Sequence, residues 1–320
     1  FTSGGTEANN MAIKGLVYAG QCQSILSSPM EHASVLQPLE QVRKQGCRVE
    51  FFSVTEQGEI DLKKSEHSIK DFKPDLVSVQ MANNETGVIQ PLADITQSVR
   101  AYSNSLIHTD ATQAIGKMEV DFQVLNVDML SLSGHKFSAP QGCGALVIKN
   151  EIMDEPLLTG GPQESGRRAG TENVALLVGL GKAAQMARTN LLEKQTYLLE
   201  LRRYFEQQLS AIHGVEIFGE KSTRLPNTSY FSIPYYHGET LLMQLDKAGF
   251  ALASGSACHS QVTLPSHVLS AMGIDSELAL NAVRVSFGMG NQRQHIDQLI
   301  GAMNELINQL PPMMRQVAGI

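Results

Sequence analysis

The sequence contains no tryptophan, only four cysteines and no Cys-x-x-Cys pair among its 320 residues. Four scattered cysteines do not make a disulfide framework, so we expect free thiols in a reducing compartment and a cytoplasmic protein. No run of about 18 apolar residues occurs, so the sequence predicts no membrane-spanning helix. No block of lysine and arginine occurs, and a formal net charge of −7 disfavours nucleic acid as a direct partner.

The composition is that of a chain with a large core, because 42% of the residues are hydrophobic and 18% are charged. The length predicts about two domains. A break in a long helical region near Thr189 and Asn190 places the boundary, so we predict one domain at 1–190 and a second at 191–320. The first residues lack an initiator Met and are typical of the middle of a domain, and we expect the N-terminal part of the first domain to be missing.

Strand-like apolar runs alternate with helical patterns through the first half of the chain. Runs of this kind lie at 24–27, 48–54, 75–81, 106–109, 127–130 and 144–149. Alternation at this spacing predicts an α/β fold with a mainly parallel sheet. The second half predicts a smaller α+β unit, with strands at 215–218, 228–233 and 282–287 and helices at 238–248 and 294–310.

Polar residues follow several of these strands, and one of them is a lysine. Lys136 comes directly after a buried strand end, in Ser133-Gly-His-Lys. The carboxyl ends of strands in an open α/β sheet are where ligands bind, and a lysine there can form a Schiff base with an aldehyde cofactor. The alternative is an ordinary surface lysine after a strand. Further polar residues at strand ends favour the site: Asn84, Asp110, Gln113, Ser133 and His135.

Two further segments carry weaker signals. Gly4-Gly5 precedes a helical pattern, with Ser3 and Thr6 as possible N-caps. A glycine-rich turn that opens a helix offers backbone N–H groups to a phosphate, although no Walker motif follows. His32 lies at a predicted strand-to-helix junction and is either a site residue or an ordinary capping histidine.

Cys258 lies among small and polar residues at 253–260. This composition predicts a mobile, accessible loop, and an accessible thiol can react. The alternative is a buried and inert cysteine, which is the usual case.

Six short motifs in order resemble those of one enzyme family: Thr2-Ser-Gly-Gly-Thr-Glu7, Asn83-Asn-Glu-Thr-Gly87, Asp110-Ala-Thr-Gln113, Ser133-Gly-His-Lys136, Arg168-Ala-Gly-Thr171 and Ser254-Gly-Ser-Ala-Cys258. The chain resembles the cysteine desulfurases, pyridoxal-phosphate enzymes of the class V aminotransferase group. The resemblance implies an aspartate-aminotransferase-like fold (PLP fold type I), pyridoxal 5'-phosphate as cofactor, and a homodimer.

The resemblance also implies roles for individual residues. Lys136 matches the lysine that holds the cofactor, Asp110 the carboxylate on the pyridine nitrogen, and His32 a histidine stacked on the ring that serves in acid–base catalysis. Arg284 matches the group that holds the substrate carboxylate, and Cys258 the nucleophile that receives sulfur. Gln113 and Asn84 match residues near the phenolic oxygen and substrate. The matches to phosphate contacts are Gly5, Thr6, Ser133, His135 and, delivered from the partner subunit, Thr171.

The implied reaction removes sulfur from L-cysteine, leaving L-alanine and a persulfide on Cys258. The context of Cys258 resembles the subgroup that supplies iron–sulfur clusters and tRNA thiolation, through a sulfur-acceptor or scaffold protein. His259 and Leu264 depart from residues common in the family and leave acceptor choice open. The alternatives are selenocysteine lyase, a plain class V aminotransferase, and a non-enzymatic scaffold for sulfur carriers.

Overall fold

The computed structural model describes residues 1–152, 155–233, 236–255, 257–259 and 262–309, with the backbone alone at 257–259 and 262–263. Its contacts divide the chain into two compact units, each described by itself below. Unit 1 consists of Phe1–Thr55, Glu59–Asn83 and Ile89–Leu191. Unit 2 consists of Glu56–Gly58, Asn84–Val88 and Leu192–Ile320. Two short segments of the first half of the chain therefore make their contacts in unit 2.

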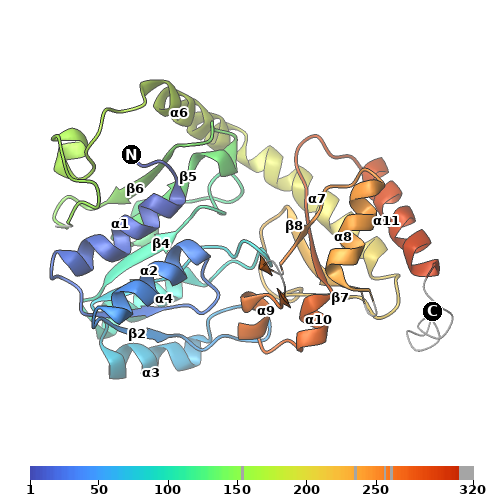
Figure 1. Cartoon of the computed structure of the whole chain (residues 1–320), viewed down its shortest axis with the longest axis horizontal. Coiled ribbons are helices and arrows are strands. Elements are labelled where there is room, and N and C mark those ends of the chain that lie inside the picture. Colours follow the sequence, from blue (N-terminus) through green and yellow to red (C-terminus); the bar gives the residue numbers. More distant parts are fainter. Residues whose placement is uncertain (153–154, 234–235, 256, 260–261, 310–320) are drawn as a thin grey trace. The chain divides into compact units, whose positions relative to one another are not determined.

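Unit 1 is built on a six-stranded sheet of order β2-β1-β3-β4-β5-β6. Figure 1 labels β2, β4, β5 and β6 of this sheet. All neighbouring strands are parallel except β5 and β6, which are antiparallel. The predicted mainly parallel sheet is thus confirmed. Its strands are β1 (Ser24–Ser27), β2 (Arg48–Phe51), β3 (Leu76–Ser78), β4 (Leu106–Asp110), β5 (Met129–Ser133) and β6 (Gly144–Ile148).

Helices cover both faces of this sheet. Successive strand residues enter opposite cores: Ile25 packs with helices α1 and α2, whereas Leu26 packs with α3 and α4. This follows from the two-residue period of a strand, whose side chains alternate between faces. The helices are α1 (Gly5–Tyr18), α2 (Ala33–Lys44), α3 (Leu62–Phe72), α4 (Leu92–Tyr102), α5 (Phe122–Leu125) and α6 (Val174–Thr189), with 3₁₀ turns η1 (Gly134–Phe137) and η2 (Gln163–Gly166).

Two elements of unit 1 differ from the sequence expectation. Helix α3 was not predicted, although Asp61 caps it by accepting hydrogen bonds from the N–H groups of Lys63 and Lys64. The strand expected at 75–81 ends at Ser78, because the chain beyond it makes single bonds to β4 rather than a full ladder: Val79 donates to the His108 carbonyl and Met81 to the Asp110 carbonyl.

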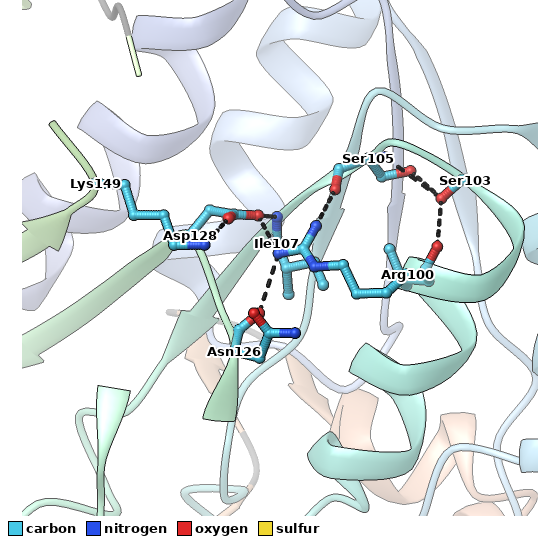
Figure 2. Close-up of polar contacts among 8 residues, drawn as sticks. Arg100, Ser103, Ser105, Ile107, Asn126, Asp128 and Lys149 are labelled. Carbon is cyan, nitrogen blue, oxygen red and sulfur yellow. Dashed lines mark hydrogen bonds and ion pairs between the residues drawn. The ribbon is translucent and has the colours of Figure 1, made fainter. Parts of the chain in front are cut away.

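The buried carboxylate of Asp128 lies at the end of β5 opposite to Ser133 and binds groups from several elements there. Figure 2 shows Asp128, just before β5, contacting two cations: Arg100 Nη2 at 2.6 Å and Lys149 Nζ at 2.6 Å. The Ile107 N–H donates to the same carboxylate at 2.8 Å. A carboxylate this well paired tolerates its burial, whereas loss of a partner would leave an uncompensated charge.

Unit 2 contains an antiparallel sheet of order β7-β8-β12-β9. Its core includes Phe205, whose ring lies 5.6 Å from that of Phe231 and 5.5 Å from that of Phe287. The predicted α+β character is confirmed. The elements are α7 (Leu191–Leu209), β7 (Glu216–Ile217), β8 (Thr228–Ser232), α8 (Gly238–Lys247), β9 (Ala253–Ser254), β10 (Ala257–His259), β11 (Val262–Leu264), α9 (His267–Ala271), α10 (Ser276–Leu280), β12 (Ala282–Ser286) and α11 (Arg293–Asn308).

The segment around Cys258 is not the irregular loop that its composition predicts. Its start forms β9, which pairs with β12, and Cys258 lies in β10, opposite Thr263 of β11. A run of small residues shows no alternation of apolar and polar side chains, so no strand can be predicted from it. The strands form through their pairing, β9 with the distant β12 and β10 with the neighbouring β11. Residues 256 and 260–261 and the Cys258 side chain lie outside the described part, so the expected mobility and exposure stay predictions.

The described part of the chain lacks two features, a membrane-spanning helix and a metal-binding cluster. No helix there is both long and apolar enough to cross a bilayer. No group of three or more His, Cys, Asp or Glu side chains there is placed to hold a metal ion.

Candidate active site

A carboxylate and a lysine lie at the carboxyl ends of adjacent parallel strands in unit 1. Asp110 is the last residue of β4, and Lys136 lies in η1, directly after β5. Because β4 and β5 are parallel neighbours, their carboxyl ends share one edge of the sheet. Asp110 is buried and Lys136 is exposed. The structure thus places the two residues where the sequence predicts them.

Hydrogen bonds fix the orientation of the Asp110 carboxylate. Its Oδ1 accepts the Thr112 N–H at 2.9 Å, and its Oδ2 accepts the Asn9 side-chain amide at 2.7 Å. Asn9 is fully buried in α1 and was not singled out in the sequence. A buried amide needs partners, and its nitrogen must face the carboxylate because a carboxylate can only accept.

The start of α1 forms a small cradle with the ends of β4 and β5. Gly4, the N-cap, provides no side-chain cap. A Cβ at Gly5 would lie 2.8 Å from Thr112 Oγ1 and 3.3 Å from Ser133 Cβ, so only glycine lets the backbone come this close. Thr112 Oγ1 is buried, and no described residue forms a hydrogen bond with it. An uncapped helix N-terminus beside an unused hydroxyl group suits an anion such as phosphate.

His135 extends this cradle from η1. Its Nδ1 lies 3.0 Å from Ser133 Oγ. Partial burial, and then the charge of neighbouring Lys136, lower the pKa of His135. The imidazole is therefore neutral near pH 7 and can pair with the serine hydroxyl. Thr6, the other predicted phosphate contact, is exposed in the first turn of α1.

His32 caps α2, as one of the two readings of the sequence predicts. Its Nδ1 accepts the Ser34 N–H at 3.1 Å and lies 2.8 Å from Ser34 Oγ. The same hydroxyl accepts the Asn9 amide at 2.9 Å. A continuous set of hydrogen bonds therefore joins His32 to Asp110 through Ser34 and Asn9.

Two other predicted residues of unit 1 lie in different surroundings. Gln113 accepts a hydrogen bond from Lys117 Nζ at 2.7 Å. Thr171 is exposed and lines a hollow of about 250 Å³. The loop before it is tied to α1 by Arg168, whose Nε lies 2.9 Å from Glu7 Oε1.

Arg284 and Asn84 belong to unit 2 and contact each other there. Arg284 lies on β12, and its Nη1 donates to the Asn84 carbonyl at 2.6 Å. Arg284 Nε and Asn84 Oδ1 are buried, and neither has a hydrogen-bond partner among the described residues. Unsatisfied buried polar atoms are rare and indicate a place where a ligand can bind.

A buried carboxyl group lies next to this pair. Glu85 accepts a hydrogen bond from Ser266 Oγ, and burial raises the pKa of Glu85 despite its hydrogen bonds and the charges of His267 and Arg284. A Cβ at Gly255 would collide with the Tyr230 hydroxyl and lie 2.8 Å from Glu85 Oε2. Only glycine fits at 255, so this cluster fixes the backbone shortly before Cys258.

Comparison with known proteins gives a consistent result. The family model for aminotransferase class-V matches residues 1–299. The chain is 39% identical over 315 residues to cysteine desulfurase IscS of Methanosarcina thermophila, covering 98% of this chain and 78% of that protein.

The chain belongs to the cysteine desulfurases of the class-V aminotransferase family.

Solved structures of similar fold agree with this family. A NifS-like protein superimposes with a TM-score of 0.90 at 32% identity, covering 97% of this chain and 82% of that one. The structure titled SspA in complex with cysteine gives a TM-score of 0.76 at 30% identity, covering 89% and 80%. The predicted aspartate-aminotransferase-like fold is thereby confirmed.

In this cysteine desulfurase the motif residues divide between the units. Unit 1 contains His32, Asp110, Gln113, Ser133, His135, Lys136 and Thr171, with Gly5 and Thr6, whereas unit 2 contains Asn84, Cys258 and Arg284. Sequence reasoning missed Asn9, Ser34, Thr112 and Glu85. Asn9 offered a signal, because it occupies a position on the buried face of α1 between Ala8 and Ala12.

Proposed function

We propose that this protein is a pyridoxal-phosphate-dependent cysteine desulfurase that converts L-cysteine to L-alanine and leaves a persulfide on Cys258. The observation that carries the proposal is the shared sheet edge of Asp110 and Lys136, beside the cradle at the start of α1, in a chain of this family. The names of its relatives support the substrate.

The residues of unit 1 suit the cofactor. The uncapped N-terminus of α1, the unused Thr112 hydroxyl and the Ser133–His135 pair would hold the phosphate. Asp110, oriented by two donors, would hold the ring nitrogen, and the exposed Lys136 would hold the aldehyde carbon. When bound, the cofactor supplies an electron-accepting ring. His32 would move protons at its Nε2.

The residues of unit 2 suit the amino-acid substrate and its sulfur. Arg284 retains a buried Nε donor, so its guanidinium can bind a carboxylate in a bidentate manner. The Cys258 thiolate would form an S–S bond to the substrate sulfur as the substrate C–S bond breaks. The electron pair of the broken C–S bond goes to the substrate carbon, which also takes up the proton of the substrate thiol and gives alanine. No external oxidant is therefore needed.

The other cysteines are poor candidates for this step. Cys22, Cys47 and Cys143 are buried free thiols, and burial raises the pKa of each, that of Cys22 to about 12. A thiol with a raised pKa provides almost no thiolate near neutral pH. Three buried free thiols also fit a reducing compartment, and we propose a cytoplasmic location.

Self-association and sulfur delivery complete the proposal. Helix α6 exposes Val174, Val178 and Met186 to more than half of their full extent. An apolar helix face of this kind fits a homodimer, in which the exposed Thr171 would contact the phosphate of the partner subunit's cofactor. The persulfide sulfur would pass to an acceptor or scaffold protein for iron–sulfur cluster or thio-cofactor synthesis.

Product analysis with L-cysteine and a thiol reductant tests the proposal. We expect sulfide and alanine in equal amounts, an almost complete loss of both with Cys258→Ser, and near-normal rates with Cys47→Ala as a matched cysteine control. Near-normal desulfuration by Cys258→Ser would overturn the persulfide step. Activity with selenocysteine but not with L-cysteine would show that selenocysteine, and not L-cysteine, is the substrate.

A further inference from the structure

Asn9 joins two catalytic candidates that lie on different elements. Its side-chain nitrogen donates one hydrogen to Asp110 Oδ2 at 2.7 Å and the other to Ser34 Oγ at 2.9 Å. The residue is fully buried, and its own carbonyl oxygen has no hydrogen-bond partner among the described residues. An unpaired buried carbonyl lowers the stability of the fold, so packing alone gives no reason for an asparagine here.

The directions of these hydrogen bonds follow from the chemistry of the groups. The Asn9 nitrogen is only a donor, so Ser34 Oγ accepts from it and can give its own hydrogen to His32 Nδ1, 2.8 Å away. The Ser34 backbone N–H also donates to Nδ1, at 3.1 Å. An imidazole nitrogen that accepts a backbone N–H carries no proton. The neutral ring of His32 therefore has its proton on Nε2.

We propose that Asn9 is a positioning residue that acts on both ends of the hydrogen-bonded series His32–Ser34–Asn9–Asp110. Through Ser34 it strengthens the hydrogen bonding that keeps the His32 proton on Nε2, and directly it holds the Asp110 carboxylate in place. A proton can then leave or reach His32 at Nε2 without disturbing the cap of α2. The catalytic meaning of this arrangement rests on the proposed function, but the hydrogen-bond pattern does not.

Variants of Ser34 and Asn9 separate the effect on His32 from the effect on Asp110. Ser34→Ala removes the hydroxyl between Asn9 and His32 but leaves the bond between Asn9 and Asp110. Asn9→Leu removes both bonds with a side chain of similar size. Asn10→Ala is the matched control, because Asn10 is in the same helix but its side chain donates to the Thr6 carbonyl of its own helix, at 2.9 Å.

Two spectroscopic readouts report the two ends. The first is the ¹⁵N NMR spectrum of histidine-labelled full-length protein without cofactor, with His32 assigned from His32→Gln. We expect an unprotonated, hydrogen-bonded Nδ1 in the wild type, and a Nδ1 resonance moved toward that of a free acceptor in Ser34→Ala and, less strongly, in Asn9→Leu. The second is the absorption band of bound pyridoxal phosphate, which should change in Asn9→Leu and not in Ser34→Ala.

Steady-state kinetics add a third readout. We expect a roughly 10- to 100-fold lower kcat in Asn9→Leu with a nearly unchanged KM for L-cysteine. A wild-type Nδ1 resonance together with a wild-type absorption band in folded Asn9→Leu would overturn the proposal, as would a protonated Nδ1 in the wild type. A protein with the expected spectra but without sulfide release would contradict the proposed function and leave the hydrogen-bond relay intact.

Discussion

Asp110 in unit 1 has both carboxylate oxygens hydrogen bonded within the chain, whereas Arg284 in unit 2 leaves a buried Nε without a partner among the described residues. The same contrast separates His32, held by Ser34, from Asn84, whose Oδ1 is buried and has no hydrogen-bond partner in the part of the chain that the structure describes. Groups that are fixed in advance suit a cofactor that stays in place. Groups with bonding capacity to spare suit a substrate that binds and leaves with each turnover.

The strongest way to break this comparison is Lys136→Ala. If unit 1 holds the cofactor, the variant should lose covalent attachment and about 10⁴-fold in kcat. The change should appear as loss of the absorption band that borohydride abolishes. Lys44→Ala, at an exposed position in the last turn of α2, is the control. If Lys136→Ala still showed the borohydride-sensitive band, the assignment of cofactor binding to unit 1 through Lys136 would be wrong.

Acid sharpens the comparison at two buried groups, His108 in unit 1 and Glu85 in unit 2, on which it acts with opposite sign. His108 is fully buried between Ser78 and Ser131, and burial lowers its pKa from 6.5 to about 4. The unfolded chain therefore binds a proton here first, and stability is lost as pH falls from about 6.5 to 4, by roughly 3 kcal/mol. Burial raises the pKa of Glu85 in unit 2, so acid relieves the cost of burying it.

Calorimetric melting of wild type and His108→Gln isolates this contribution. Glu31, which is also in unit 1, has a raised pKa, so its contribution to the pH dependence of stability is opposite in sign to that of His108. This contribution is the same in both proteins and does not affect their difference. Between pH 7 and pH 4 the melting temperature of the wild type should therefore fall further than that of the variant. Equal shifts in the two proteins would show that His108 does not titrate in this range.

Arg284→Lys tests whether unit 2 binds the substrate carboxylate through a planar fork. Lysine keeps the charge but cannot bind bidentately, so KM for L-cysteine should rise by about 10²-fold while cofactor absorbance is retained. Arg293→Lys, at the exposed start of α11, is the control. An unchanged KM would move substrate recognition away from Arg284.

Gly255→Ala probes how the unit 2 cluster positions the strand that contains Cys258. The new Cβ meets Tyr230 and Glu85, so the backbone must shift, and we expect sulfur transfer to slow by roughly 10-fold with cofactor binding unchanged. Tyr230→Phe should partly restore the rate in the double variant. Gly288→Ala serves as control, since a Cβ there meets its nearest atom at 3.8 Å. A normal rate in Gly255→Ala would separate this cluster from catalysis.

The sequence predicts the positions of Lys136, Asp110 and His32 well, because each lies at or shortly after the end of an apolar strand that can be read locally. It does not predict a role for Thr112 or Ser34, since the contacts of both arise only when α1, α2 and β4 are brought together. The pairing of β9 with β12 is likewise invisible, because it joins residues about 30 positions apart with no alternation to guide it. Asn84 follows a predicted strand of the first half of the chain, yet its contacts lie in unit 2.

The Asp128 cluster has a consequence for how unit 1 assembles. Its partners come from α4, the start of β4 and the end of β6, so all of them meet Asp128 only when these strands are aligned residue for residue (Figure 2). Sliding β6 by one position would turn Lys149 to the other face and leave a buried anion short of a cation. The carboxylate thus acts as a check on strand alignment during folding, at the edge of the sheet opposite the chemistry.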